Sequence, residues 1–286
     1  MKRIFALMIA LCLCAAVVPA LAEADEVQPL AEGASLTVDL DGDGADETVA
    51  WTMAPGKYGD ACLALNVAAA NGESLQYVTD ITWNGGVYVH DMDADGLPEI
   101  LMTGDVMSDD YYTWCLQYRG GKLIEVLFPD CERGDNSDGY FKQGYGLITR
   151  ITDHVVQLTG SQDVLGTWMA SRVVSLDFPG RFEFCDNGLW ERPGDYEGDD
   201  SLWEYGALIV RAPLKYVGEH GSEDGVLNPG DKVLVYATDK RSEAHFLTRD
   251  GRSGILEIST DYDRGWGLLV DGIPEAEGFE MIPYAD

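Results

Sequence analysis

The chain has 286 residues, of which 50 are acidic and 19 are basic, so its formal net charge is −31 at pH 7. A surface this acidic repels nucleic acid and anionic membranes and attracts cations, which excludes nucleic-acid binding as a function class. An apolar content of 46% with 10% aromatic residues excludes a disordered chain, because enough apolar surface is present to form a core.

The first 22 residues have the layout of a secretory signal peptide. Two basic residues precede an apolar run from Ile4 to Val18, and "ALA" at 20–22 is an A-x-A cleavage pattern. The alternative is a membrane anchor, but the run is short for a membrane span and ends in small residues. Cleavage before Glu23 predicts a secreted or extracytoplasmic protein of the cell surface, with no membrane span in the mature chain.

Beyond this segment, short runs rich in Val, Ile, Tyr, Trp and Thr alternate with turn residues, and helical periodicity is nearly absent. The 33 glycines punctuate these runs, a pattern typical of an all-β protein. The strands expected first along the chain are "SLTVDL" (35–40), "ETVAWTM" (47–53), "CLALNVAA" (62–69), "VYVHDM" (87–92), "YYTWCLQY" (111–118), "HVVQL" (154–158) and "ASRVVSLDF" (170–178).

An internal repeat runs through these strands. "DLDGDGADETVAWT" from Asp39 matches "DMDADGLPEILMTG" from Asp91, 52 residues later, and Cys62 matches Cys115 at an offset of 53. A fainter third copy aligns "TWM" at 167–169 with "TWC" at 113–115 and places its loop in "YGLITRITD" (145–153). Three units of about four short strands predict a partial or small propeller-like domain. Closed propellers have about four to eight blades, so a hidden blade, an open array and closure through another chain all stay open.

A second folded region is expected after a linker. "RPGDYEGDDS" (192–201) is acidic and aperiodic, which places an acidic linker at 195–206, between a repeat domain at 23–194 and a second domain at 207–286. Within the second domain, "LNPGDKVLVY" is a turn that enters a strand, and "RDGRSG" joins two further strands. This is the strand order of a small five-stranded barrel.

The two acidic loops have the spacing of a cation site. In D-x-D-x-D-G-x-x-E, a curled loop turns alternate carboxylates inward, the glycine permits a sharp turn, and the glutamate closes the shell from the next strand. Oxygen-only ligands at this spacing suit Ca²⁺, and without a cation the converging carboxylates would repel one another. The alternative is a solvated acidic turn without metal. The ligands expected for about two Ca²⁺ ions are Asp39, Asp41, Asp43 and Glu47 in one loop and Asp91, Asp93, Asp95 and Glu99 in the other.

The loops resemble the calcium loops of FG-GAP/VCBS β-propeller repeats, in which a D-x-D-x-D-G-x-x-[DE] hairpin precedes an apolar strand. The resemblance covers about residues 35–189 and implies the same eight ligands. An EF-hand differs, because its glutamate stands at loop position 12 and helices flank its loop. The region 207–284 resembles a bacterial SH3-like domain through "LNPGDKVLVY" and "DGRSGILEI". That second resemblance implies an SH3-like barrel and makes cell-wall binding an expectation.

Four cysteines remain after cleavage: Cys62, Cys115, Cys131 and Cys185. In an exported chain they permit two disulfides with three connectivities. Cys62 and Cys115 lie among apolar residues, so buried free thiols are at least as well supported. The absence of a C-x-x-C motif argues against a structural zinc site.

The sequence contains no recognisable catalytic motif, and its four histidines fit no metal-protease pattern. Trp83, in the turn-like "TWNGG", is the candidate for an exposed ligand-binding aromatic residue. The leading hypothesis is therefore a non-enzymatic calcium-binding adhesion or ligand-binding module, whose partner is a cell-wall component, a glycan or an extracellular protein. The alternative is a secreted hydrolase acting on polysaccharide or peptidoglycan. A monomer is expected, because two chains of this charge repel each other.

Overall fold

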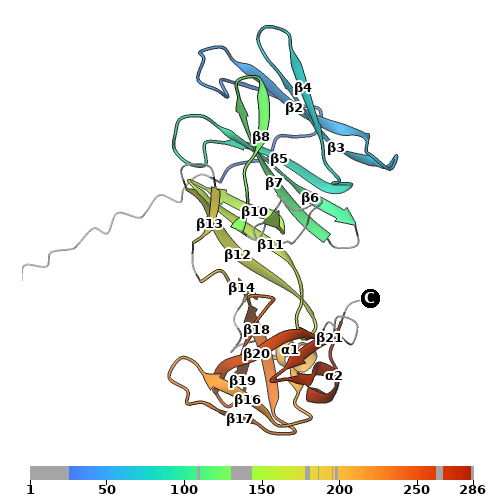
Figure 1. Cartoon of the computed structure of the whole chain (residues 1–286), viewed down its shortest axis with the longest axis vertical. Coiled ribbons are helices and arrows are strands. Elements are labelled where there is room, and N and C mark those ends of the chain that lie inside the picture. Colours follow the sequence, from blue (N-terminus) through green and yellow to red (C-terminus); the bar gives the residue numbers. More distant parts are fainter. Residues whose placement is uncertain are drawn as a thin grey trace, which may run out of the picture.

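The computed structural model describes residues 26–107, 110–129, 144–177, 181–185, 187–194, 196, 199–261 and 267–284. Its described part is all-β, built from antiparallel sheets of which none is closed, and this confirms that the chain is an all-β protein. Figure 1 shows the sheets following one another along the long axis of the molecule. The expected signal peptide (1–22) and Cys131 lie outside the described residues. Over the described ranges, no helix is both long and apolar enough to cross a bilayer.

The first two sheets are meanders in which successive strands pair. The first sheet contains β1 Ser35–Val38, β2 Glu47–Pro55, β3 Ala61–Ala68 and β4 Ser74–Val78. The second sheet contains β5 Trp83–His90, β6 Glu99–Met107, β7 Asp110–Arg119 and β8 Lys122–Glu125, with the short β9 Gly144–Tyr145 paired to β7. These bounds confirm the strands expected from the apolar runs of this region and add β4, β6, β8 and β9, which the expected strands did not include.

The second sheet is a middle layer that is buried on both faces. Along β6, Ile100 and Met102 belong to a core shared with the first sheet, whereas Leu101 between them belongs to a core shared with the third sheet. Successive side chains of a strand point to opposite faces, so one apolar run supplies both cores. This is why "ILM" is continuous rather than alternating with polar residues.

The third sheet follows and runs directly into the C-terminal region. Its strands are β10 Leu147–Thr152, β11 Val155–Asp163, β12 Thr167–Asp177, β13 Arg181–Phe184 and β14 Trp190–Glu191. The remaining elements are α1 Asp200–Tyr205, β15 Leu208–Ile209, β16 Leu214–Gly218, β17 Gly225–Leu227, β18 Lys232–Thr238, β19 Glu243–Thr248, β20 Ser253–Asp261, β21 Gly267–Val270, β22 Ile273–Pro274 and α2 Glu275–Gly278. In the C-terminal region, β18, β19 and β20 form an antiparallel meander.

The strand ladders correct the finer repeat alignments. Cys115 on β7 pairs with Leu101, which lies two residues after Glu99, and the corresponding pair in the first sheet is Val49 with Val67. Cys62 and Cys115 are therefore not equivalent positions, and the match at an offset of 53 is wrong. Likewise Trp114 pairs with Met102, but Trp168 pairs with Gln162 near the far end of its hairpin. The connection between β2 and β3 is longer than the connection between β6 and β7. Residues after these connections therefore no longer match at the offset that aligns the acidic loops.

The segment expected as an acidic linker, 195–206, is ordered into a helix where it is described. Asp199 caps α1 by accepting hydrogen bonds from the backbone N–H groups of Ser201 and Leu202. Trp203 is buried on this helix and donates its indole N–H to the Tyr196 carbonyl at 2.8 Å. A capped turn with a buried aromatic anchor is a packed element, so the part of the linker segment around α1 is ordered although its sequence is aperiodic.

A two-residue strand joins the repeat region to the C-terminal region. β14 pairs with β12 through Ser171 and Glu191, and with β18 through Trp190 and Thr238. One hydrophobic core accordingly contains residues of the second sheet, the third sheet and the C-terminal strands. Figure 1 shows β14 between the two regions. The division expected at 194 therefore falls within a continuous sheet and core.

The residues before β1 cross all three sheets. Val27 donates its N–H to Ile151 in the third sheet, Leu30 donates to Val87 in the second, and Gly33 donates to Trp51 in the first. Trp51 returns an indole hydrogen bond to the Leu30 carbonyl at 2.7 Å. This segment ties the edges of the stacked sheets together.

The outer faces of the array are polar, which bears on self-association. In the first sheet, Ala50, Asn66 and Gln76 form one row of the face that points away from the second sheet. In the third sheet, the hydroxyls of Thr149, Thr159 and Ser171 form a hydrogen-bonded chain. These polar rows favour contact with water over burial against a second copy.

We therefore expect the protein to be a monomer at micromolar concentration in low salt, where repulsion between chains of net charge −31 is strongest. Light scattering should give the mass of one chain. A mass near twice that value, persisting on dilution, would instead mean that a second chain closes the array.

Candidate metal centre

Each acidic loop connects the first two strands of its sheet. Residues 39–46 lie between β1 and β2, where Val38 pairs with Glu47. Residues 91–98 lie between β5 and β6, where His90 pairs with Glu99. The two loops thus occupy equivalent places in the first and second sheets, as the sequence repeat predicts.

The two loops share their backbone hydrogen bonds. Gly44 donates its N–H to Asp39 Oδ2, and Gly96 donates its N–H to Asp91 Oδ2, both at 3.0 Å. Gly44 and Gly96 have φ of +85° and +87°, in the left-handed region that glycine adopts without strain. The curl of the D-x-D-x-D-G sequence is therefore built twice with the same geometry.

A buried glutamate and a buried apolar residue anchor each loop. Glu47 and Glu99 are 3% and 0% exposed. Their Oε2 atoms each accept the backbone N–H of the residue after the first aspartate, Leu40 or Met92, at 2.9 Å. Leu40 and Met92 are themselves fully buried. The sequence reading did not single out these two residues, although an apolar residue at the second loop position of both copies is the signal for them.

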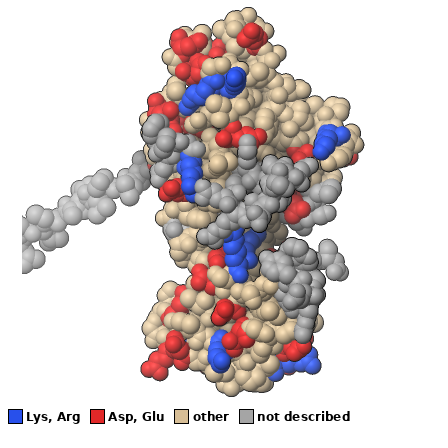
Figure 2. Space-filling model, viewed as in Figure 1, with Lys and Arg blue, Asp and Glu red and all other residues tan. Residues whose placement is uncertain are grey.

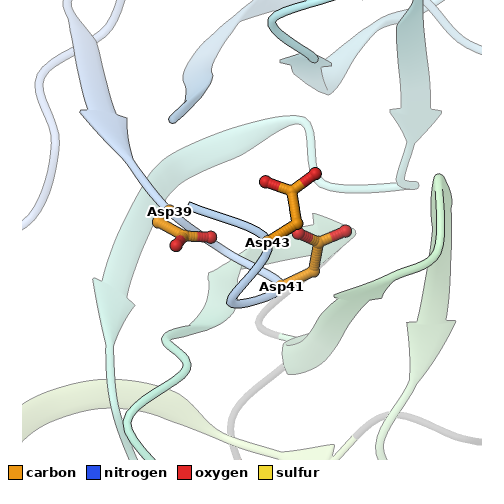
Figure 3. A group of neighbouring side chains, drawn as sticks. All are labelled: Asp39, Asp41 and Asp43. Carbon is orange, nitrogen blue, oxygen red and sulfur yellow. The ribbon is translucent and has the colours of Figure 1, made fainter. Parts of the chain in front are cut away.

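The first loop gathers three carboxylates. One oxygen from each of Asp39, Asp41 and Asp43 lies within 4.8 Å of the others, and Figure 3 shows all three side chains projecting from the single curled loop. Asp41 Oδ1 is buried and has no hydrogen-bond partner. A buried carboxylate oxygen without a donor is costly, and a hard cation would satisfy it. The donor set of this loop fits Ca²⁺.

The second loop gathers a different set of three carboxylates. Asp91, Asp93 and Glu99 bring their oxygens within 4.8 Å of one another, and Asp91 Oδ1 is buried without a partner. Asp95, the fourth expected ligand, instead makes an ion pair with Arg119 at 3.3 Å. In the first loop the expected ligand outside the cluster is Glu47, which bonds the Leu40 N–H. The structure thus brings together six of the eight residues in two groups of three.

Burial and mutual repulsion raise the pKa values of Glu47, Asp93 and Glu99. Burial, followed by the charges of Asp93 and Asp95, raises the pKa of Glu99 to about 7, although hydrogen bonds from Met92 and Gln117 oppose the shift. Burial is also the largest cause that raises the pKa of Glu47 and of Asp93, and neighbouring aspartates add to it. A bound cation would oppose all of these shifts, because it favours the ionised carboxylates.

The third unit has a tight turn in place of an acidic loop. The sequence places a third loop in 145–153, but Leu147–Thr152 is strand β10, and the turn before β11 consists of Asp153 and His154. Asp153 has φ of +49°, a conformation that short hairpin turns require. The His154 ring donates from Nδ1 to the Met92 carbonyl at 3.0 Å, so this turn packs against the second loop. The third unit therefore offers no cluster like the other two among its described residues.

Trp83 lies at a β-bulge, and the three residues that follow it line a groove. The pairing of β5 with β6 shifts register between Trp83 and Gly86, and Asn84 has φ of +50°. Trp83 is 60% exposed, as expected for a candidate ligand-binding residue. Asn84, Gly85 and Gly86 line a groove of about 420 Å³ together with residues 29–32 of the N-terminal segment. Bulges often re-aim side chains next to functional sites.

Cys62, Cys115 and His90 lie in packed parts of the structure. Cys62 and Cys115 are buried free thiols, and burial raises the pKa of both, which disfavours the reactive thiolate form. Cys185 is exposed and forms no disulfide with either of them. His90 donates from Nε2 to the Asp153 carbonyl at 2.8 Å, which places it in the contact between the second and third units.

Comparison with protein-family models, with curated proteins and with solved structures finds no match to this chain.

Proposed function

We propose that the protein is an exported, non-enzymatic calcium-binding adhesion or ligand-binding module. The carrying observation is the duplication of one loop geometry, with three carboxylates converging in each copy and a buried carboxylate oxygen left without a donor in each. Two unrelated solvated turns are not expected to have the same hydrogen bonds, glycines with positive φ at the same position and a buried glutamate at the same position. The arrangement is accounted for if both loops were selected to hold a hard cation such as Ca²⁺.

In this proposal, calcium rigidifies a stack of FG-GAP/VCBS-like units, and the C-terminal SH3-like region extends the molecule for docking. Acidic side chains lie on both the upper and lower parts of the face in Figure 2, in keeping with a surface that binds cations and stays soluble outside the cell. Trp83 supplies an exposed aromatic ring, and the groove lined by the residues that follow it in sequence supplies polar groups such as Asn84 and Thr103, a combination suited to a glycan or an extended segment of a cell-wall component or extracellular protein.

The first test is thermal stability. A ligand held only by the folded state stabilises that state by about 2.7 kcal/mol at a hundredfold excess over Kd. We expect the melting temperature to rise by several degrees with millimolar Ca²⁺ and to return to its original value with a chelator. Mg²⁺ at the same concentration should have a smaller effect, because it demands a more rigid octahedral shell than these loops offer. A melting temperature that is indifferent to calcium would contradict the proposal.

A further inference from the structure

Arg119 lies between the two acidic loops and contacts both. It is the last residue of β7, and its Nη2 atom lies 3.3 Å from Asp95 Oδ2 and 3.9 Å from Glu99 Oε1 in the second loop. Its Nη1 atom donates to the Leu40 carbonyl of the first loop at 3.1 Å. Leu40 in turn donates its N–H to Glu47. A continuous polar chain therefore runs from the glutamate of the first loop to the aspartate and glutamate of the second.

The same contact recurs one unit further along. The carbonyl of Met92, at the position in the second loop that Leu40 has in the first, accepts a hydrogen bond from His154 of the third unit. In both cases a side chain from the next unit caps the second residue of the preceding loop. The stacked hairpins are thus linked loop to loop, and the guanidinium of Arg119 is the member of this series that also makes ion pairs with a carboxylate cluster.

The two loops differ in charge because of this arginine. Arg119 is only 26% exposed and Glu99 is fully buried, so the ion pairs are partly shielded from solvent. Gln117 adds a neutral hydrogen bond to Glu99 Oε1 at 2.9 Å. Among the described residues of the first loop's cluster, no arginine or lysine makes an ion pair with Asp39, Asp41, Asp43 or Glu47.

We infer that Arg119 is a built-in counter-ion of the second loop, which makes the two loops bind calcium with unequal affinity. This inference rests on the proposed calcium binding. Without calcium, the guanidinium partly neutralises Asp95 and Glu99. With calcium, the same positive charge repels the incoming ion and competes with it for Asp95, so the second loop binds more weakly than the first. Arg119 acts through Asp95 and Glu99 and is a positioning residue.

The test isolates each loop and then removes the arginine. Asp41→Ala disables the first loop and Asp93→Ala disables the second, and Arg119→Gln is added to each background before calcium titration in a calorimeter. In the Asp41→Ala background we expect Arg119→Gln to tighten calcium binding about tenfold, because a partly buried positive charge near the ion is lost. In the Asp93→Ala background we expect a change of less than about threefold, since Arg119 contacts a backbone carbonyl of the first loop and makes its ion pairs with carboxylates of the second loop.

Arg119→Lys is the matched control, because it keeps the positive charge but loses the planar guanidinium, which can donate two parallel hydrogen bonds. It should bind calcium at the second loop within about threefold of the unchanged protein, since the repelling charge remains. Equal tightening of both loops by Arg119→Gln, no tightening at the second loop, or an Arg119→Lys variant that behaves like Arg119→Gln would each overturn the inference.

A measurement without calcium separates this inference from the proposed function. In chelator, Arg119→Gln should lower the melting temperature by about 2–4 °C, the shift expected for roughly 1 kcal/mol in a protein of this size class. An unchanged or higher melting temperature would mean that Arg119 is not a counter-ion. If instead neither single-loop variant binds calcium while Arg119→Gln still destabilises the calcium-free protein, calcium binding fails and the counter-ion role stands.

Discussion

Calorimetric titration of the protein with Ca²⁺ should detect about two sites, and the double variant Asp41→Ala, Asp93→Ala should detect none. Each substitution removes a central carboxylate from one of the two clusters. The remaining two carboxylates of a cluster provide too few oxygens for an ion that takes six to eight. We expect the dissociation constants of the unchanged protein to lie roughly between micromolar and millimolar, the range of calcium sensors and extracellular modules.

Asp46→Ala is the control for this experiment. Asp46 is exposed and immediately precedes Glu47, but its carboxylate does not belong to the cluster of the first loop. Its loss removes one negative charge from the same loop without removing a ligand, so affinity should change by less than about threefold at physiological ionic strength. No heat of binding from the unchanged protein at millimolar calcium would refute the assignment of either loop as a calcium site.

Trp190→Ala should destabilise the whole molecule by about 3–5 kcal/mol, the usual cost of deleting a large buried aromatic residue. Trp190 is 2% exposed on β14, the strand that joins the third sheet to the C-terminal region. The Arg172 guanidinium lies 4.2 Å from the centroid of its ring, and the Tyr145 ring packs edge-on at 5.6 Å. Deletion of the ring would leave a cavity in the core that both regions share.

Urea unfolding followed by circular dichroism and by fluorescence would measure this effect. Because one core spans both regions, the two probes should report one coincident transition, before and after the substitution. Trp83→Ala is the matched control, since the same side chain is 60% exposed there and its loss should change stability by less than about 0.5 kcal/mol. Two separated transitions in the unchanged protein would show that the regions unfold independently.

The features that depend on residues close together in the chain could be predicted from the sequence. The D-x-D-x-D-G-x-x-E loops are closed by hydrogen bonds within nine residues, such as that from Gly44 to Asp39. The local sequence alone therefore specifies the conformation of each loop. The strands follow from apolar runs between turn residues for the same reason. The exposure of Trp83 was also predictable, because a Trp-Asn-Gly-Gly sequence favours a bend or bulge.

The features that depend on stacking were decided only by the tertiary structure. Arg119 reaches Asp95 from 24 residues away and Leu40 from 79 residues away, and neither separation follows any local period. The pairing of β6 with β7 inside the second sheet brings Arg119 to Asp95, and the contact with Leu40 depends on how the first and second sheets pack. The role of β14 likewise could not be predicted from its two residues, because it arises from pairing with strands on both sides. Local hydrogen bonds specify each loop, but the contacts between loops belong to the packing of whole sheets, whose free energy is spread over distant residues.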